Sequence, residues 1–379
     1  MKSEMATACI FCKTSGSKFS EEHVIPNFLG GRKKLTDIVC AKCNSEFGRT
    51  IEAEMSKQLN TFRVLFGLLS NRGETVPPIK RIKLKDGRIV NLVHGGKPVF
   101  AVPIIEKEEK SDGTIHINAI AGNVKQFKQI IEGHKRKGEI EGVTKVEGQE
   151  YIKEYLPLKL SLGGSDFFRA TAKIAFNLLT TLLSHEEISS SQFELIRDYI
   201  REGKISEEEP VWYDFDCPFS LGNPIGPIDH SVAVACDPDS HQIVGWVRFY
   251  QAFCFRVGLS NSWQGKKIGV YYRVNPIERK DIEGEWWPND PNIFQRTFIR
   301  QSIPDMFKKM EKATKYILTQ WQDKAYNDVI QEITKKCMQE VLGNADGRIL
   351  TEEDVAKLAE CVAERYVKFV FRLDSKESG

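Results

Sequence analysis

The sequence predicts an α+β protein, and three features along the chain predict it. Two close cysteine pairs near the N-terminus are typical of a small zinc-stabilised fold. Segments with period-two alternation, separated by turn residues, indicate antiparallel strands in the middle of the chain, and two long helices finish it. At 379 residues and 41% hydrophobic residues, the chain is long enough for two or three domains and apolar enough for a packed core.

Composition and charge exclude several classes of protein. A formal net charge of +2 argues against a histone-like polycation but allows a local basic face. Met1–Ala8 contains two charges and no apolar core, which predicts no signal peptide, and the longest apolar run, Ile174–Leu183, is too short to span a membrane. Nine cysteines without an export signal favour thiols or metal ligands over a disulfide framework. We therefore expect a cytoplasmic protein with no membrane partner.

The cysteine pairs have the spacing of a structural zinc site. Cys9 and Cys12 form the first pair, Cys40 and Cys43 form the second, and 27 residues separate Cys12 from Cys40. Four thiolates make a closed tetrahedral cage for Zn²⁺. The spacer is longer than the roughly 15–20 residues of simple zinc ribbons. It is therefore either a surface loop or a second site mounted on the zinc frame.

The spacer and the residues after it carry an ordered set of motifs. They are Glu21-Glu22-His23-Val24-Ile25-Pro26, Leu29-Gly30-Gly31, Asp37-Ile38-Val39, Cys40-Ala41-Lys42-Cys43-Asn44 and Phe47-Gly48. This order resembles a branch of the HNH endonuclease family in which a ββα-metal finger lies between two CxxC zinc knuckles, EHxxP…LGG…VCxxCNxxFG. The resemblance covers Cys9–Glu54, about one eighth of the chain, which we call the finger.

The chemistry of these residues suits phosphodiester hydrolysis. This reaction needs a base that activates water and a cation that stabilises the developing negative charge. His23 suits the first role, because an imidazole with a pKa of about 6.5 accepts a proton at neutral pH. Glu22 and Asn44 offer the oxygen ligands that Mg²⁺ prefers.

The resemblance implies a role for each of these residues. His23 would be the general base, and Glu22 and Asn44 would bind a catalytic Mg²⁺ or Mn²⁺ ion, separate from the zinc. Asp37 stands where many relatives carry an asparagine that orients the imidazole, so its carboxylate would either orient His23 or face solvent. DNA would be the substrate. Relatives often belong to restriction and anti-phage defence systems, in which self-association or a regulatory partner would release the nuclease.

A second class of function stays open at this stage. The finger would then be a zinc-stabilised module that binds nucleic acid or protein without catalysis, and His23 and Asn44 would only support its fold. Metal dependence separates the two hypotheses, because a pure binding module needs no Mg²⁺.

The pattern after the cysteines predicts a helix and then a basic β-rich segment. Asn44–Leu59 has apolar residues at four-residue spacing. Arg81–Leu92 reads as a hairpin around Asp86-Gly87, a second hairpin turns at Asp112-Gly113, and Gln126–Lys137 reads as a helix.

Ile79–Gly138 holds thirteen Lys or Arg against six Asp or Glu. This excess either protects an exposed sheet edge or binds nucleic-acid phosphates. The candidate phosphate-binding residues are Lys80, Arg81, Lys83, Lys85 and Arg88.

An amphipathic helix is predicted over Ser165–Ser184. Arg169, Lys173 and Asn177 recur at four-residue spacing and form one polar stripe on it. The stripe reads either as a solvated face or, less favoured, as a ridge that binds the nucleic-acid backbone. A shorter helix is expected over Ser191–Arg201.

The remaining chain predicts a sheet followed by helices. The expected strands are Val211–Phe215, Ser231–Cys236, Ile243–Leu259 broken near its middle, and Ile268–Val274. We expect their aromatic residues to form the core and His230 and His241 to be structural or exposed. Helices are predicted over Pro304–Leu342 and Thr351–Phe371. The expected domains are a nuclease finger domain (1–70), a basic β-rich segment (71–160), an α+β domain (161–300) and a helical region (301–379).

Overall fold

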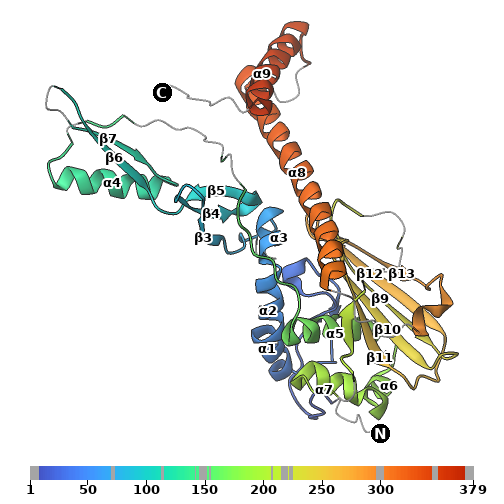
Figure 1. Cartoon of the computed structure of the whole chain (residues 1–379). Coiled ribbons are helices and arrows are strands. Elements are labelled where there is room, and N and C mark those ends of the chain that lie inside the picture. The colour runs from blue at the N-terminus through green and yellow to red at the C-terminus, as the bar shows by residue number, and fades with distance from the viewer. Residues whose placement is uncertain are drawn as a thin grey trace. The chain divides into compact units, whose positions relative to one another are not determined.

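The protein is a mixed α+β chain with antiparallel sheets and C-terminal helices, as its sequence predicts (Figure 1). The computed structural model describes residues 8–69, 73–111, 115–140, 142–144, 152, 155–205, 208–214, 221, 225–295, 303–343 and 349–371. Within these ranges, no helix has both the length and the apolar character that a membrane crossing requires.

The chain folds into two compact units. The first contains Met1–Arg63, Gly67–Val76 and Leu160–Gln320, and the second contains Val64–Phe66, Pro77–Lys159 and Trp321–Gly379. The finger therefore shares a unit with residues more than a hundred positions further along the chain. The four-part division expected from the sequence stays a prediction.

The first unit is built on a six-stranded antiparallel sheet. Its order is β13-β12-β9-β10-β11-β8. The bounds are β8 Val211–Tyr213, β9 His230–Asp237, β10 Gln242–Phe249, β11 Phe253–Ser260, β12 Ile268–Asn275 and β13 Lys280–Glu285. The strand expected to break near its middle is the β10–β11 hairpin, and only β13 was not predicted. Of the two histidines, His230 is buried at the start of β9 and His241 is exposed, as expected.

Helix α5 (Ser165–Leu179) packs across one face of this sheet. Gly245 of β10 permits the close approach, because a Cβ atom there would lie 2.7 Å from the Cβ of Ala175. The predicted helix ran five residues too far, since Thr180 already closes α5. The expectation of an aromatic core is confirmed. The five aromatic residues that sequence patterning assigned to it are all at least 98% buried: Trp246, Phe249, Tyr250, Phe253 and Phe255.

Short helices complete the first unit. α6 (His185–Ser189) begins with a capping box in which Ser184 and Glu187 bond each other's backbone N–H groups. A 3₁₀ turn, Ser191–Phe193, leads into α7 (Glu194–Glu202), which ends at Gly203 in the left-handed region. The helix expected from Ser191 thus begins as a 3₁₀ turn. A further 3₁₀ turn, Pro291–Gln295, covers the sheet face opposite α5 with Ile293 and Phe294.

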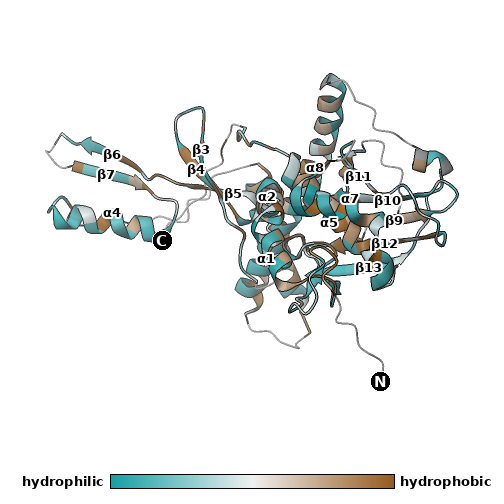
Figure 2. Ribbon diagram, turned by 90° about the horizontal axis from the view of Figure 1, so that it is seen from below, coloured by the Kyte–Doolittle hydropathy of each residue, from teal (hydrophilic) through white to brown (hydrophobic). Residues whose placement is uncertain are grey.

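The second unit contains the β3–β4 hairpin (79–93), which carries Lys80, Arg81, Lys83, Lys85 and Arg88 and which we call the basic hairpin. A three-stranded sheet is formed by β3 (Ile79–Lys83), β4 (Ile89–Val93) and β5 (Lys97–Phe100), which confirms the first predicted hairpin. β6 (Ile104–Glu109) pairs with β7 (Ile115–Ile120), as the second predicted hairpin requires, although Asp112 and Gly113 lie outside the described residues. α4 (Val124–Arg136) follows and is mostly hydrophilic in Figure 2.

Two C-terminal helices match the prediction closely. α8 covers Ile303–Leu342 and α9 covers Glu352–Val370, with Thr351 and Asp354 forming the expected capping box. A disulfide joins Cys337 of α8 to Cys361 of α9, with their Cα atoms 5.8 Å apart. The expectation that these cysteines would stay thiols is therefore wrong. Two sites 24 residues apart on different helices give no spacing signal, because their proximity depends on how the helices pack.

Candidate active site

The finger has the ββα order that the resemblance predicts. β1 (Glu22–His23) pairs antiparallel with β2 (Lys34–Leu35), and α1 (Ala41–Arg49) follows. A 3₁₀ turn over Asn27–Leu29 and the glycine pair after it reverse the chain between the strands. Gly30 has a φ of 87°, and a Cβ on Gly31 would lie 1.7 Å from the carbonyl oxygen of Ile25. The Leu-Gly-Gly motif is therefore a steric requirement of this turn.

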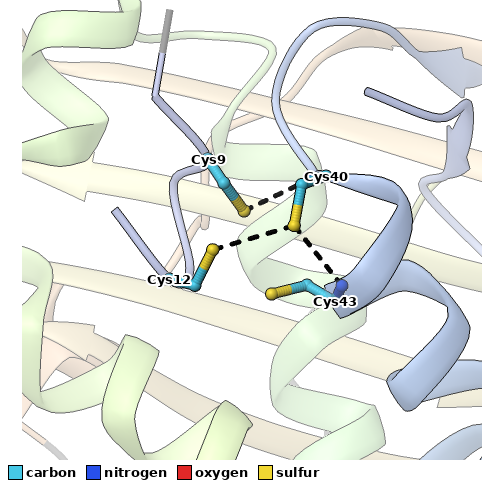
Figure 3. Close-up of side chains that lie close together, drawn as sticks. All are labelled: Cys9, Cys12, Cys40 and Cys43. Atoms are coloured by element: carbon cyan, nitrogen blue, oxygen red, sulfur yellow. Dashed lines mark hydrogen bonds between the residues drawn. The ribbon is translucent and has the colours of Figure 1, made fainter. Parts of the chain in front are cut away.

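The four paired cysteines come together at the base of the finger. Their sulfur atoms all lie within 4.8 Å of one another and converge in Figure 3. Zn–S bonds of about 2.3 Å in a tetrahedron place sulfur atoms just under 4 Å apart, so the cluster fits one structural zinc ion. Cys40 also caps α1, because its sulfur accepts a hydrogen bond from the Cys43 backbone N–H. This explains why the second pair opens a helix.

The predicted helix over Asn44–Leu59 is wrong in two respects. It begins earlier, at Ala41, because the Cys40 cap starts it. It also breaks at Thr50, whose φ of −108° and ψ of −92° separate α1 from α2 (Ile51–Gln58). The break lets Phe47 pack against Phe11, which lies between Cys9 and Cys12, while Glu52 lines the pocket described next.

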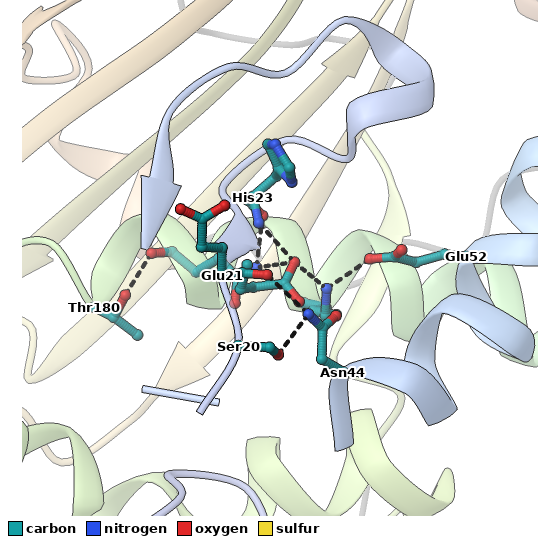
Figure 4. Close-up of polar contacts among 9 residues, drawn as sticks. Ser20, Glu21, His23, Asn44, Glu52 and Thr180 are labelled. Atoms are coloured by element: carbon teal, nitrogen blue, oxygen red, sulfur yellow. Dashed lines mark hydrogen bonds and ion pairs between the residues drawn. The ribbon is translucent and has the colours of Figure 1, made fainter. Parts of the chain in front are cut away.

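A pocket of ≈ 390 Å³ opens beside β1 in the first unit. It is lined by Glu21, Glu22, His23, Pro26, Asn27, Phe28, Asn44, Glu52, Arg63 and Glu74. Three of the four residues predicted for catalysis therefore share one cavity. Figure 4 shows His23, Asn44 and Glu52 around one group of polar contacts, to which β1, α1 and α2 contribute; His23 joins it through its backbone, and its imidazole points away from the dashed contacts.

His23 lies half-buried in this pocket with its backbone fixed at both ends. Its N–H donates to Glu22 Oε1 at 3.0 Å, and its carbonyl oxygen accepts from Asn177 Nδ2 at 2.9 Å. Burial lowers the pKa of the imidazole, and the nearby Lys34 charge acts in the same direction. The neutral form, which accepts protons, is thereby favoured at neutral pH.

Glu22 is a buried carboxylate, and only one of its two oxygens has a partner among the described residues. Lys173 Nζ lies 2.6 Å from Glu22 Oε1 and 2.6 Å from Glu52 Oε1. Burial raises the pKa of the Glu22 carboxyl, while the Lys173 ammonium opposes this rise. Burial would lower the pKa of Lys173, but Glu52 and Glu22 outweigh it and raise that pKa. Glu22 Oε2 has no hydrogen-bond partner among the described residues.

Two hydrogen bonds from its amide nitrogen orient the Asn44 side chain. Nδ2 donates to Ser20 Oγ at 2.9 Å and to the Glu21 carbonyl oxygen at 2.8 Å (Figure 4). This arrangement leaves Oδ1 as the acceptor end of the amide within the pocket. Together with Glu22 Oε2 it provides the oxygen donors that a divalent ion requires, and Glu52 adds a carboxylate to the same pocket. The residues present therefore fit a hard cation.

The polar stripe on α5 corrects the sequence interpretation. Lys173 and Asn177 are 2% and 1% exposed and contact Glu22 and His23, so the stripe is neither a solvated face nor a backbone-binding ridge. Arg169, one turn earlier, donates to the carbonyl oxygens of Ile200 and Arg201 at the end of α7. The i, i+4, i+8 spacing was the available signal. This spacing could not show whether the stripe faces solvent or a buried site, because the sequence does not reveal that the finger covers this face.

Two groups of predicted site residues lie outside the pocket. Asp37 is exposed, has a φ of 59°, and does not line the pocket that contains His23. Lys80, Arg81, Lys83 and Lys85 are exposed on the β3–β4 hairpin of the second unit, whereas Arg88 is half-buried and pairs with Asp86 at 2.5 Å. Their binding of nucleic acid stays a prediction.

Replacing Lys173 with methionine is expected to destabilise the first unit by about 3–5 kcal/mol, the usual cost of leaving a buried ionic partner unpaired. Urea denaturation measures this as a lower midpoint. Combining Lys173→Met with Glu22→Gln and Glu52→Gln should recover much of the loss, because no buried charge then lacks a partner. Lys204→Met removes an exposed pair and serves as the control. An unchanged urea midpoint in Lys173→Met would contradict a stabilising ionic contact of Lys173 with Glu22 and Glu52.

Comparison with known proteins agrees with this geometry. Residues 9–60 match the model of a family described as HNH endonuclease, which confirms the resemblance predicted from the finger. The match ends before Arg63 and before α5, so it contains neither Arg63, Lys173 nor Asn177. Searches of curated proteins and of solved structures give no match.

Proposed function

We propose, on the premise that residues 9–60 form an HNH-type finger, that the protein is a metal-dependent endonuclease that hydrolyses phosphodiester bonds in DNA. The observation that carries this proposal is the shared pocket of His23, Glu22 and Asn44, in which one oxygen of Glu22 is free of hydrogen bonds to the described residues. These groups are a proton acceptor and a set of metal ligands, which are the two requirements of the reaction.

In the proposed mechanism, a water molecule attacks the phosphorus atom, and His23 accepts a proton from this water. The backbone contacts of His23 to Glu22 and Asn177 hold β1 in place, and His23 lines the pocket. Glu22 and Asn44 would hold Mg²⁺ or Mn²⁺, and this ion when bound supplies charge stabilisation for the phosphate and the leaving oxygen. Lys173 fixes the Glu22 carboxylate through Oε1, which leaves Oε2 for the metal.

The zinc ion in this proposal is structural. Four cysteine sulfurs close a site that offers no position for water or substrate, as in the structural zinc sites of other proteins. Its contribution is to join the start of the finger to the start of α1, beside Asn44.

The biological setting we propose is restriction or anti-phage defence, with the chain beyond the finger as the part that senses a trigger. Its support is the size of that part and its direct contact with the site through Lys173 and Asn177. A regulatory partner or a second copy of the chain would then act through α5.

A plasmid-nicking assay tests the nuclease proposal. Purified zinc-loaded protein is incubated with supercoiled plasmid in Mg²⁺, in Mn²⁺ and in buffer without added divalent ion, beside an RNA of matched length. A chelator is avoided because it would also remove the structural zinc. Nicked or linear DNA that forms only with the added divalent ion supports the proposal. Intact plasmid, together with equal DNA binding with and without Mg²⁺, would favour a binding module without catalysis.

The basic hairpin is expected to supply sequence-independent affinity. Changing Lys80, Lys83 and Lys85 to glutamine should weaken binding to all DNA sequences. The slope of log binding constant against log salt concentration should also become shallower, by about 0.9 for each phosphate that a lysine no longer neutralises. Fluorescence anisotropy across a salt series measures both. The control changes three exposed lysines of α8, Lys308, Lys312 and Lys315, to glutamine. Equal slopes for the two variants would assign the hairpin lysines to a solvated sheet edge.

A further inference from the structure

Arg63 is a buried cation without an acidic partner among the described residues. Its side chain is 6% exposed, and its Nη1 donates to Ser56 Oγ at 2.8 Å. The guanidinium carbon lies 5.4 Å from the ring centroid of Phe28. Within the described ranges, Nε has no hydrogen-bond partner and the side chain forms no ion pair. Buried charges in proteins are normally paired, so this guanidinium is suited to an anion.

The position of Arg63 shows which anion would meet it. Arg63 lines the pocket that contains His23, Glu22 and Asn44, and among the described lining residues it alone carries a permanent positive charge. The acidic side chains of the same pocket would repel a phosphate. An arginine fork with unused donors offsets this repulsion, because it binds phosphate oxygens with charge-assisted hydrogen bonds.

A second cavity shares one lining residue with this pocket. Phe28 also lines a second cavity of ≈ 250 Å³, together with Arg32 and Arg279. Arg32 is anchored there, since its Nη1 donates to the Arg279 carbonyl oxygen at 2.6 Å. A strand whose phosphate lies at Arg63 could thus meet a second basic position, Arg32, in the cavity that shares Phe28 with the pocket.

We propose that Arg63 is a phosphate-binding residue of this pocket, which contacts a non-bridging oxygen of the nucleic-acid backbone beside His23, and that Arg32 binds the backbone at a neighbouring phosphate. The nucleic-acid substrate in this inference rests on the proposed function. The buried guanidinium that lacks an acidic partner among the described residues carries the inference itself.

The test uses the full-length zinc-loaded chain with His23→Ala, so that binding is measured without cleavage. Its probe is a fluorescein-labelled 20-base-pair DNA duplex in buffer without added divalent ion, because a chelator would also remove the zinc. Arg63→Met should weaken binding roughly 10-fold or more and lower the salt slope by about 0.9, as expected when one charge-assisted bond to phosphate is removed. Arg63→Lys should recover part of the affinity. Without DNA, Arg63→Met should melt no lower than the parent, because an unpaired buried charge has been removed.

Arg197→Met is the matched control. Arg197 is also buried, but its two terminal nitrogens donate to the carbonyl oxygens of Ile188 and Ser190, and it lies outside both pockets. It should lose thermal stability and keep the salt slope. Arg32→Gln, at an exposed position, covers the case in which Arg63→Met does not fold and should weaken binding several-fold.

Unchanged affinity and slope in Arg63→Met, or in Arg32→Gln if Arg63→Met does not fold, would overturn the inference. So would a lower melting temperature of Arg63→Met with an unchanged slope, which indicates a purely structural arginine. Failure of the nuclease proposal looks different: the plasmid stays intact in Mg²⁺ and Mn²⁺ while Arg63→Met still loses affinity. Cleavage by the protein that retains His23, with normal DNA binding by Arg63→Met, would instead support the nuclease proposal and rule out the phosphate site.

Discussion

His23→Ala is expected to lower DNA cleavage by roughly 10²-fold or more, the usual scale for removing a general base. The fold, the zinc content and the DNA affinity should stay as in the parent protein. The reason is that the contacts of His23 with Glu22 and Asn177 use its backbone, which alanine retains. Nicking rates on supercoiled plasmid across an Mg²⁺ titration measure the loss, and added metal should not reverse it.

Two further variants make this result specific. Asp37→Ala should cut as fast as the parent, because Asp37 is exposed and lies outside the pocket. Glu22→Gln should raise the Mg²⁺ or Mn²⁺ concentration needed for half-maximal cleavage, so that added metal restores part of its activity. If His23→Ala cuts at the rate of the parent in the same titration, the nuclease assignment fails and the binding module takes its place.

Cys40→Ser is expected to remove the zinc ion and unfold the finger. Structural zinc sites contribute about 10–16 kcal/mol of apparent binding free energy, which in small zinc domains is folding free energy. The loss also removes the sulfur that caps α1. The zinc content measured by elemental analysis should fall from about one ion per chain to none. DNA cleavage should be lost together with the zinc.

Cys236→Ala is the control for the zinc prediction. Cys236 is a buried free thiol in β9, outside the four-cysteine cluster, so its loss should cost packing energy and leave the zinc content unchanged. One full equivalent of zinc in Cys40→Ser would show that the cluster is not the zinc site.

The parts of the site that are local in sequence could be predicted, and the parts that depend on packing could not. Glu22, His23 and Asn44 stand within a short ordered motif, and the structure brings them to one pocket. Lys173 is 151 residues from Glu22, so nothing in the sequence near the finger points to it. Its helix was predicted, but the buried character of its polar stripe required knowledge of the neighbouring surface.

The same distinction holds for the secondary structure. Alternation and turn residues located β9, β10, β11 and β12, because these strands are rich in apolar and aromatic residues. β13 (Lys280–Glu285) was missed because it is an exposed edge strand of mainly charged residues, which is held by pairing with β12. The break at Thr50 was missed because the apolar spacing continues across it from Phe47 to Met55.

The contacts of α5 and β12 with the finger indicate that the finger would not keep its structure if it were cut out of this chain. Phe11, between the first two cysteines, packs on Phe176 of α5 with ring centroids 5.8 Å apart, and the Tyr272 hydroxyl of β12 accepts hydrogen bonds from the backbone N–H groups of Arg32 and Lys33. A fragment cut after residue 60 would expose Phe11 and leave Glu22 without its ammonium partner. The structural unit in this chain is therefore the finger together with the helix and sheet that support it, although more than a hundred residues separate them in the sequence.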